Sequence, residues 1–123
     1  MPTTPSQLLL LHATYHIAGT LWIETDGERC FGPGKMELLQ GIEKTGSINK
    51  AAKAMGMSYK KAWKMVQELN AHFAQPMVIT QGGGEGGGGS SVTPEAKILM
   101  TYHAGMRARL EAFLEQERKL LAL

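Results

Sequence analysis

The chain has 123 residues, of which 43% are hydrophobic and 20% are charged, with a formal net charge of +2 and a single cysteine, Cys30. These values predict one soluble globular domain and exclude an internal disulfide. The longest apolar run, residues 8–11, is far too short for a membrane span, and no basic segment leads into an apolar one at the N-terminus. We therefore expect a reduced, cytoplasmic protein.

The N-terminal residues have the weakest pattern. Residues 1–7 contain two prolines and small polar side chains, and they predict a loose arm. Residues 8–17 are richer in apolar side chains and predict a short helix that docks on the core or on a partner. His12 and His16 have the spacing of two metal ligands on one helix face, but no third ligand lies nearby in the sequence, so we predict no metal site.

A β-hairpin and a helix are predicted next. Residues 19–25 carry β-branched and aromatic side chains in rough alternation, and the Asp-Gly dipeptide at 26–27 favours a tight turn into a short returning strand. Pro33 suits the beginning of a helix because its missing N–H would be unpaired there anyway. We predict this helix over residues 35–44, with Gly46 ending it.

Positive charge is concentrated in residues 44–67, which contain six lysines and no carboxylate. A local excess of this sign favours a polyanionic partner. The simpler alternative is an ordinary helical hairpin whose lysines are a solvated face. The absence of any intervening acid, together with the turn described next, favours DNA.

The same residues have the pattern of two helices joined by a sharp turn. Ser47 is a good N-cap for the first helix, Gly56 suits its C-terminus, and Ser58 can cap the second. Small residues at the crossing, a turn containing glycine and a basic outer face with Lys60, Lys64 and Gln67 predict a helix-turn-helix. The residues at buried helical spacing are Ile48, Ala51, Ala52 and Met55 in the first helix, and Tyr59, Ala62, Val66, Leu69 and Phe73 in the second.

A glycine-rich tract follows the second helix. Residues 77–80 and 90–93 are short β-type runs, and residues 82–89 between them have the sequence GGGEGGGG. A strand, a flexible tip and a second strand predict a wing, in which glycine lets backbone N–H groups approach phosphates. A flexible Gly/Ser linker is the alternative. A phosphate-binding P-loop is excluded, because Gly-Lys-Ser/Thr is absent.

Thr93 and Pro94 begin the last predicted helix, which runs to about residue 121. Its apolar residues recur at alternating spacings of four and three, as in a coiled-coil seam, and a small monomer has too little core to cover so long a stripe. We therefore predict a homodimer through this helix, with residues 8–17 as a candidate second contribution. The predicted seam consists of Leu99, Met106, Leu110, Phe113 and Leu120, with His103 and Glu117 as polar members rather than catalytic residues.

With the wing included, residues 32–103 resemble the N-terminal DNA-binding domain of the molybdate-responsive ModE regulators, a winged helix-turn-helix related to that of LysR-type regulators. The resemblance implies that the glycines are a native wing. It also implies a departure, because regulators of that family carry a C-terminal pair of molybdate-binding domains that no residues of this chain match. We therefore expect a stand-alone DNA-binding half without molybdate sensing. The matching motifs are Thr45-Gly46-Ser47-Ile48, the alanines 51 and 52, Gly56-x-Ser58-Tyr59-Lys60-x-Ala62-Trp63, Leu69-Asn70, and the glycine-rich tract ending near Thr93.

The predicted fold is mainly α with a small β wing, organised as an N-terminal arm or short helix (1–17), a winged helix-turn-helix (18–93) and a C-terminal dimerisation helix (94–123). We predict a homodimeric transcriptional regulator that binds a two-fold symmetric site in double-stranded DNA, with helix 58–73 in the major groove and the wing along adjacent phosphates. For Trp63, burial in the core is at least as well supported as DNA contact. The candidate DNA-binding residues are Ser47, Ser58, Tyr59, Lys60, Lys61, Trp63, Lys64, Thr80, Gly83, Gly86, Gly88 and Ser90.

The alternative function is a protein-interaction module that keeps the fold and dimerises with another regulator through residues 8–17 and 95–121. An enzyme is not predicted, because the sequence shows no nucleophile–base pair, no carboxylate pair and no cofactor fingerprint. No cofactor is predicted either.

Overall fold

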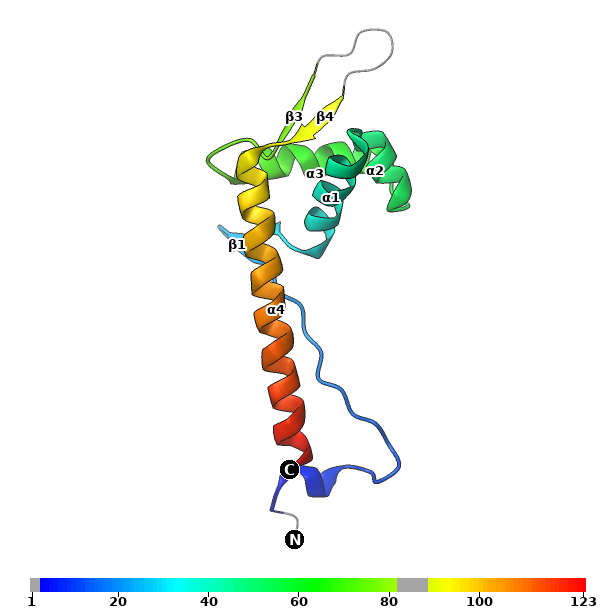
Figure 1. Ribbon diagram of the computed structural model, residues 1–123, viewed down its shortest axis with the longest axis vertical. Coiled ribbons are helices and arrows are strands. Elements are labelled where there is room, and N and C mark those ends of the chain that lie inside the picture. The colour runs from blue at the N-terminus through cyan, green and yellow to red at the C-terminus, as the bar shows by residue number, and fades with distance from the viewer. Residues whose placement is uncertain (1–2, 82–88) are drawn as a thin grey trace. The chain divides into compact units, whose positions relative to one another are not determined.

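The computed structural model describes residues 3–81 and 89–123 of the chain. Contacts group the chain into two compact units, which are Trp22–His103 and the segment pair Met1–Leu21 with Ala104–Leu123. The elements, in chain order (Figure 1), are a 3₁₀ helix η1 (Pro5–Leu8), strands β1 (Ile23–Thr25) and β2 (Glu28–Phe31), helices α1 (Pro33–Thr45), α2 (Ile48–Ala54) and α3 (Tyr59–His72), strands β3 (Val78–Thr80) and β4 (Ser90–Val92), and helix α4 (Pro94–Ala122).

Helix α1 follows the sequence signals at both of its ends. It begins at Pro33, and its C-cap Gly46 has a φ of 69° and donates its N–H to the carbonyl oxygen of Ile42 at 2.7 Å. The prediction of a helix over 35–44 is confirmed, with a few more residues at the ends. The buried side chains of this helix are Leu38, Leu39 and Ile42.

The core of the Trp22–His103 unit gathers side chains from all of its helices and from both hairpins. Helices α1, α2 and α3 pack against one another, and the first turns of α4 contribute Ala96 and Met100. Small residues let the helices approach closely, and both Ala51 and Ala52 on α2 are completely buried. The buried cluster is Phe31, Leu38, Leu39, Ile42, Ile48, Ala51, Ala52, Ala62, Val66, Leu69, Met77, Val78, Ala96 and Met100.

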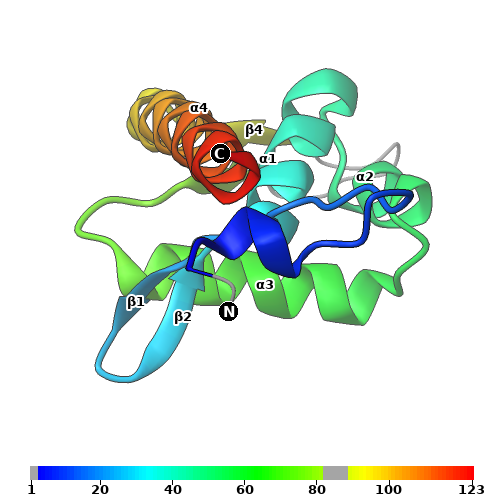
Figure 2. The same cartoon turned by 90° about the horizontal axis from the view of Figure 1, so that it is seen from below.

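Strands β1 and β2 form an antiparallel hairpin beside the C-terminal end of α3 (Figure 2). Its turn residues Asp26 and Gly27 have φ of 52° and 79°, the positive values that an Asp-Gly hairpin turn favours. The strand predicted over residues 19–25 is too long, since only Ile23–Thr25 is paired. The partner strand ends at Phe31, where the chain turns into α1, so the residues before Ile23 have no strand to pair with.

Strands β3 and β4 form the predicted wing after α3 (Figure 1). They pair antiparallel from Val78 opposite Val92 to Thr80 opposite Ser90. The described part of the hairpin closes with a hydrogen bond from the N–H of Gln81 to the carbonyl oxygen of Gly89 at 2.9 Å. The winged helix-turn-helix fold with a long C-terminal helix is thus confirmed.

Of the two alternatives for the N-terminal residues, an arm or a short helix, the helix over residues 8–17 does not form. The only helical turn near them is η1, and residues 9–22 contain no helix. The reason lies in the pattern of residues 8–11, whose apolar side chains are consecutive and would point to all sides of a helix instead of sharing one face. The apolar content of the segment was therefore a poor guide to its secondary structure.

Helix α4 is well defined at its N-terminus. The hydroxyl of Thr93 accepts the N–H of Ala96 at 3.1 Å, and Pro94 is the first helical residue. The buried residues of α4 all lie in its first turns, and Ala122 ends the helix close to the predicted position. Among the helices of the described residues, none combines the length and apolar content that crossing a membrane requires.

Candidate nucleic-acid interface

Helices α2 and α3 form the helix-turn-helix, and each is capped by a serine. Ser47 Oγ accepts the N–H of Lys50, and Ser58 Oγ accepts the N–H of Lys61, both at 3.1 Å. Between the helices, Gly56 has a φ of 69°, which lets the chain reverse without a steric penalty from a Cβ atom. The capping and turn signals that predicted the motif are therefore all used in the structure.

The outer faces of α2 and α3 carry exposed lysines. Lys50 and Lys53 are exposed on α2, and Lys60, Lys61 and Lys64 are exposed on α3. Neither helix has an acidic residue in its first turn, so the lysine charges add to the partial positive charge of the helix N-termini. Within the described part of the chain, none of these lysines belongs to an ion pair. The face is thus positive and unneutralised, as binding to a polyanion requires.

Two aromatic side chains occupy the beginning of α3. Tyr59, which the helical spacing places on the buried face, is 51% exposed, because the buried stripe of α3 begins only at Ala62. Trp63 is half-buried and packs against the hydrophobic core. The two rings stack with their centroids 6.5 Å apart and their planes inclined by 13°. Trp63 therefore joins the core to an exposed aromatic side chain on the basic face.

The base of the wing is held by polar side chains whose role the sequence did not reveal. Asn70 Oδ1 accepts the N–H groups of Met77 at 2.8 Å and Val78 at 3.1 Å, and Asn70 Nδ2 donates to the carbonyl oxygen of Val78 at 3.0 Å. At the other strand, the Thr93 hydroxyl donates to the carbonyl oxygen of Pro76 at 2.7 Å. The Leu-Asn dipeptide at 69–70 was a family motif in the sequence, but only the structure shows that its asparagine positions the wing.

The wing residues proposed as DNA contacts are only partly described. Thr80 is exposed at the end of β3, and Ser90 is half-buried at the start of β4. The N–H of Ser90 donates to the carbonyl oxygen of Gly46 at 2.9 Å, so it fastens the wing to the end of α1. The remaining predicted wing contacts, Gly83, Gly86 and Gly88, lie outside the described residues.

The predicted dimer seam divides between the two units. In the Trp22–His103 unit, Leu99 is half-buried against the core, and His103 is only 4% exposed, with its ring edge-on to Phe31 at 5.1 Å. His103 is thus part of the core instead of a seam. In the Ala104–Leu123 segment, Met106 and Leu110 are half-buried, whereas Phe113 and Leu120 are 57% and 46% exposed.

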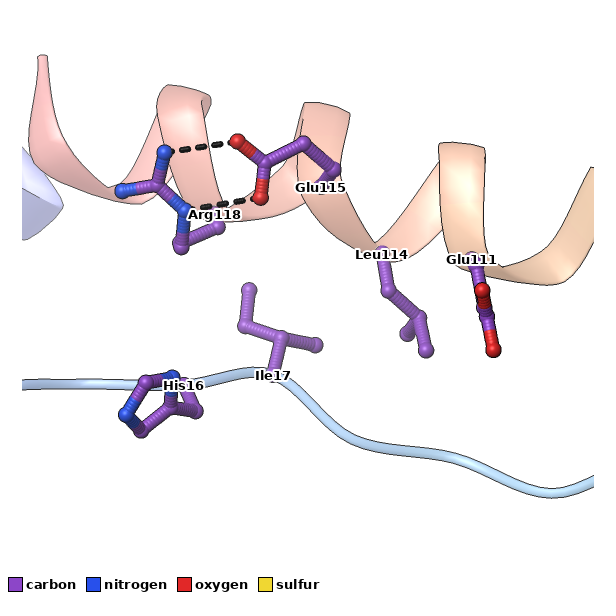
Figure 3. A pocket seen from close by; sticks show the side chains of 6 residues that line it. All are labelled: His16, Ile17, Glu111, Leu114, Glu115 and Arg118. Carbon is purple, nitrogen blue, oxygen red and sulfur yellow. Dashed lines mark hydrogen bonds and ion pairs between the residues drawn. The ribbon is translucent and has the colours of Figure 1, made fainter.

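A shallow hollow lies within the unit that contains the N-terminal segment and the end of α4 (Figure 3). Arg118 forms a two-pronged ion pair with Glu115, and its hydrogen bond lowers the pKa of the Glu115 carboxyl, while the same bond raises the pKa of Arg118. Both groups are solvent-exposed, so the pair contributes little to stability. The residues that line the hollow are His16, Ile17, Glu111, Leu114, Glu115 and Arg118.

Metal-binding groups do not gather in the described residues. No set of three or more His, Cys, Asp or Glu side chains lies close enough in residues 3–81 and 89–123 to hold a metal ion. Cys30 is buried, and its thiol donates to the carbonyl oxygen of Ile23 at 3.2 Å. The basic face of α2 and α3 is therefore the surface whose chemistry points to a partner.

Three curated relatives match between 58% and 82% of the chain. It is 38% identical over 101 residues to the molybdenum-pterin-binding protein MopB of Rhodobacter capsulatus, a match that covers 82% of this chain and 37% of that protein. It is 30% identical over 94 residues to the molybdenum transport protein ModE of Azotobacter vinelandii, covering 76% and 35%. It is 41% identical over 71 residues to the DNA-binding transcriptional dual regulator ModE of Escherichia coli K12, covering 58% and 27%.

These matches confirm the resemblance to the ModE regulators, although the chain spans only 27% to 37% of the length of the three relatives. A family model for bacterial regulatory helix-turn-helix proteins of the lysR family matches residues 34–97. That interval contains nearly all of α1, both helices of the motif, the wing and the first turn of α4. The chain therefore belongs to the lysR family of bacterial regulatory helix-turn-helix proteins.

Proposed function

We propose that the chain is a transcriptional regulator that recognises specific DNA sequences with α3 in the major groove. The observation that carries this proposal is the two-sided character of α3. Its buried side contacts the core through Ala62, Val66 and Leu69. By contrast, Lys60, Lys61 and Lys64 are exposed and have no acidic partner among the residues that the structure describes. A helix supported in this way can enter the groove as a rigid body.

The residues near the start of α3 have different tasks in this proposal. Ser58, Tyr59 and Lys60 lie where a recognition helix reaches base edges and adjacent phosphates. Lys61 and Lys64, and Ser47 at the N-terminus of α2, hold the phosphate backbone. Thr80, Ser90 and the backbone of the wing glycines follow the phosphates beside the neighbouring minor groove.

The protein acts as a homodimer in this proposal, and its DNA site is two-fold symmetric. No described side chain of the unit made by Met1–Leu21 and Ala104–Leu123 is buried, although this unit contains Leu11, Phe113 and Leu120. Apolar side chains without a core of their own need a cover, and a second copy of α4 supplies a matching surface. Two copies of α3 then contact two half-sites.

We place the protein in the cytoplasm, where bacterial DNA lies, and we assign it no cofactor. The names of the relatives connect them with molybdenum. The matches cover 37% and 35% of these two relatives, so we do not extend molybdate sensing to this chain.

Binding of selected duplexes tests the proposal. Duplexes are enriched from a random pool with the purified protein, and fluorescence anisotropy measures their affinity at several salt concentrations, with and without molybdate. We expect tight, sequence-selective binding that weakens steeply with salt. Lys60→Ala and Lys64→Ala should each lower the salt slope by about one unit per lost phosphate contact.

Lys119→Ala is the matched control, since it removes the same charge from the last turn of α4 and should leave the slope unchanged. An unchanged slope in both α3 variants would remove these lysines from the interface. Equal, weak binding to every duplex would contradict the proposal of a sequence-specific regulator. It would favour the alternative, a protein-interaction module that dimerises with another regulator.

A further inference from the structure

Core packing accounts for Trp63 but not for the exposed position of Tyr59 at the start of α3. Tyr59 is the first residue of the helix and is 51% exposed, while its neighbours Lys60 and Lys61 are exposed as well. Part of the Tyr59 ring is covered by Trp63, and 51% of the residue remains exposed among these lysines. Such a ring has surface left for a partner.

Trp63 restricts where that ring can go. Its indole packs against the hydrophobic core, and the Tyr59 ring lies nearly parallel to it, with an interplanar angle of 13°. Residues four apart on a helix face each other, and stacked aromatic pairs are favoured at such separations. The tyrosine ring is therefore held before any partner binds, so little conformational entropy is lost on contact.

We infer that Tyr59 reads the C5-methyl group of a thymine through the apolar surface of its ring, and that Trp63 is the positioning residue that holds the ring there. The inference rests on the proposed function and specifies part of its recognition. Thymine is the base that presents an apolar group in the major groove, and the N-terminal end of a recognition helix is the part that meets base edges. The tyrosine carries no charge, so its contribution is independent of the phosphate contacts of the lysines.

The experiment removes the methyl group from the DNA. In the duplex that the wild-type protein selects, each thymine is replaced in turn by deoxyuridine, which lacks only this methyl. For wild type we expect a roughly fourfold loss of affinity at one position of each half-site, the size given by burial of one methyl-sized group. Tyr59→Phe should keep this loss, and Tyr59→Ala should bind both duplexes equally.

The result also shows which part of the tyrosine acts. If Tyr59→Phe binds as weakly as Tyr59→Ala, the hydroxyl contacts a phosphate and the inference is overturned. If no deoxyuridine position weakens wild-type binding, the inference is overturned while sequence-selective binding, and with it the proposed function, still stands. Failure to enrich any duplex would instead overturn the proposed function.

The positioning role of Trp63 needs a separate comparison. Trp63→Phe keeps an aromatic ring for Tyr59 and should retain discrimination between thymine and deoxyuridine, whereas Trp63→Leu should lose it at an unchanged salt slope. Thermal unfolding checks that Trp63→Leu is folded. If it is not, Trp63→Met, which keeps more apolar volume against the core but has no ring for Tyr59 to stack on, replaces it and should show the same loss. Discrimination that survives without the stack contradicts the positioning role.

Discussion

Asn70 connects α3 to the wing through its side-chain amide, which makes three hydrogen bonds to the backbone of Met77 and Val78. Both of those residues are buried, so water cannot easily replace a lost bond there. A side chain on α3 thus sets where the wing begins. At the scale of single residues, the fold depends on such polar groups as well as on the apolar core.

Asn70→Ala should therefore lower the free energy of unfolding by about 2 kcal/mol, because two buried N–H groups lose their acceptor. Urea denaturation, monitored by circular dichroism, measures this change. Asn49→Ala is the control, since Asn49 is exposed on α2 and its replacement should change stability by less than about 0.5 kcal/mol. Equal stability of the two variants would show that the amide bonds contribute nothing net.

The local signals of the helix-turn-helix could be predicted because they act over a few residues. Ser47 and Ser58 cap helices that begin beside them, and Gly56 adopts the positive φ of a turn. The exposure of Tyr59 could not be predicted in this way. Helical spacing assigns a face to each residue, but it does not tell where along the helix the core begins.

At the scale of elements, α1 and α2 cross at a point where no side chain fits on one of them. A Cβ atom on Gly41 would lie 2.9 Å from the Cβ of Ala51 and 3.4 Å from its Cα. The Cβ of an alanine is fixed by its backbone, so no side-chain rotation can relieve the 2.9 Å contact. The glycine lets α2 come close to α1, and this approach sets the position of the helix-turn-helix.

Gly41→Ala should destabilise the protein by roughly 1 kcal/mol, because overpacking at the crossing outweighs the higher helix propensity of alanine. Gly34→Ala, in the first turn of the same helix, is the matched control. Its Cβ would meet only the flexible end of Met65 at 4.0 Å, so stability should stay equal or rise by up to about 1 kcal/mol. Thermal or urea unfolding measures both, and a stabilising Gly41→Ala would contradict the close crossing.

In the hairpin β1–β2 and in residues 8–17, the sequence pattern did not predict the secondary structure correctly. Alternation in residues 19–25 predicted a strand, but a strand extends only as far as its partner, and β2 ends at Phe31. Residues 8–17 are apolar without sharing one face, so composition suggested a helix that does not form. For the hairpin the limit is the length of the partner strand, and for residues 8–17 it is the distribution of apolar side chains around a helix axis.

At the scale of the whole molecule, the two units differ in how much they bury. The Trp22–His103 unit has a continuous apolar core, whereas the described side chains of the other unit are all at least partly exposed. Helix α4 contributes to both units. Its first turns pack into the core, whereas its last turns have no buried side chain. Local stability should follow the same division.

Amide hydrogen exchange should show this difference and its dependence on concentration. We expect amides of residues 96–103 to be protected at every protein concentration, and amides of residues 106–120 to gain protection as the proposed homodimer forms. Mass spectrometry of peptides from α4 at several concentrations measures both regions. Equal, concentration-independent protection along α4 would contradict the dimer.

Phe113→Asp should keep the protein monomeric, because a buried charge without a partner opposes association. Sedimentation equilibrium measures the mass, and affinity for the selected duplex should fall because two half-sites are no longer bound together. Glu111→Asp, exposed near Phe113 and conserving its charge, is the control and should leave the mass unchanged. A Phe113→Asp protein that still dimerises would place the interface elsewhere.

The sequence by itself determined the helix-turn-helix, the wing and the long last helix, since caps, turns and helical periodicity depend on residues that are close along the chain. Only the tertiary structure decided the burial of His103 beside Phe31, the exposure of Tyr59 and the hydrogen bonds between Asn70 and the base of the wing. The reason is physical: burial and side-chain hydrogen bonding depend on which surfaces meet when the chain folds. Local pattern identifies the elements, whereas contacts between them decide which of their residues remain available to a partner.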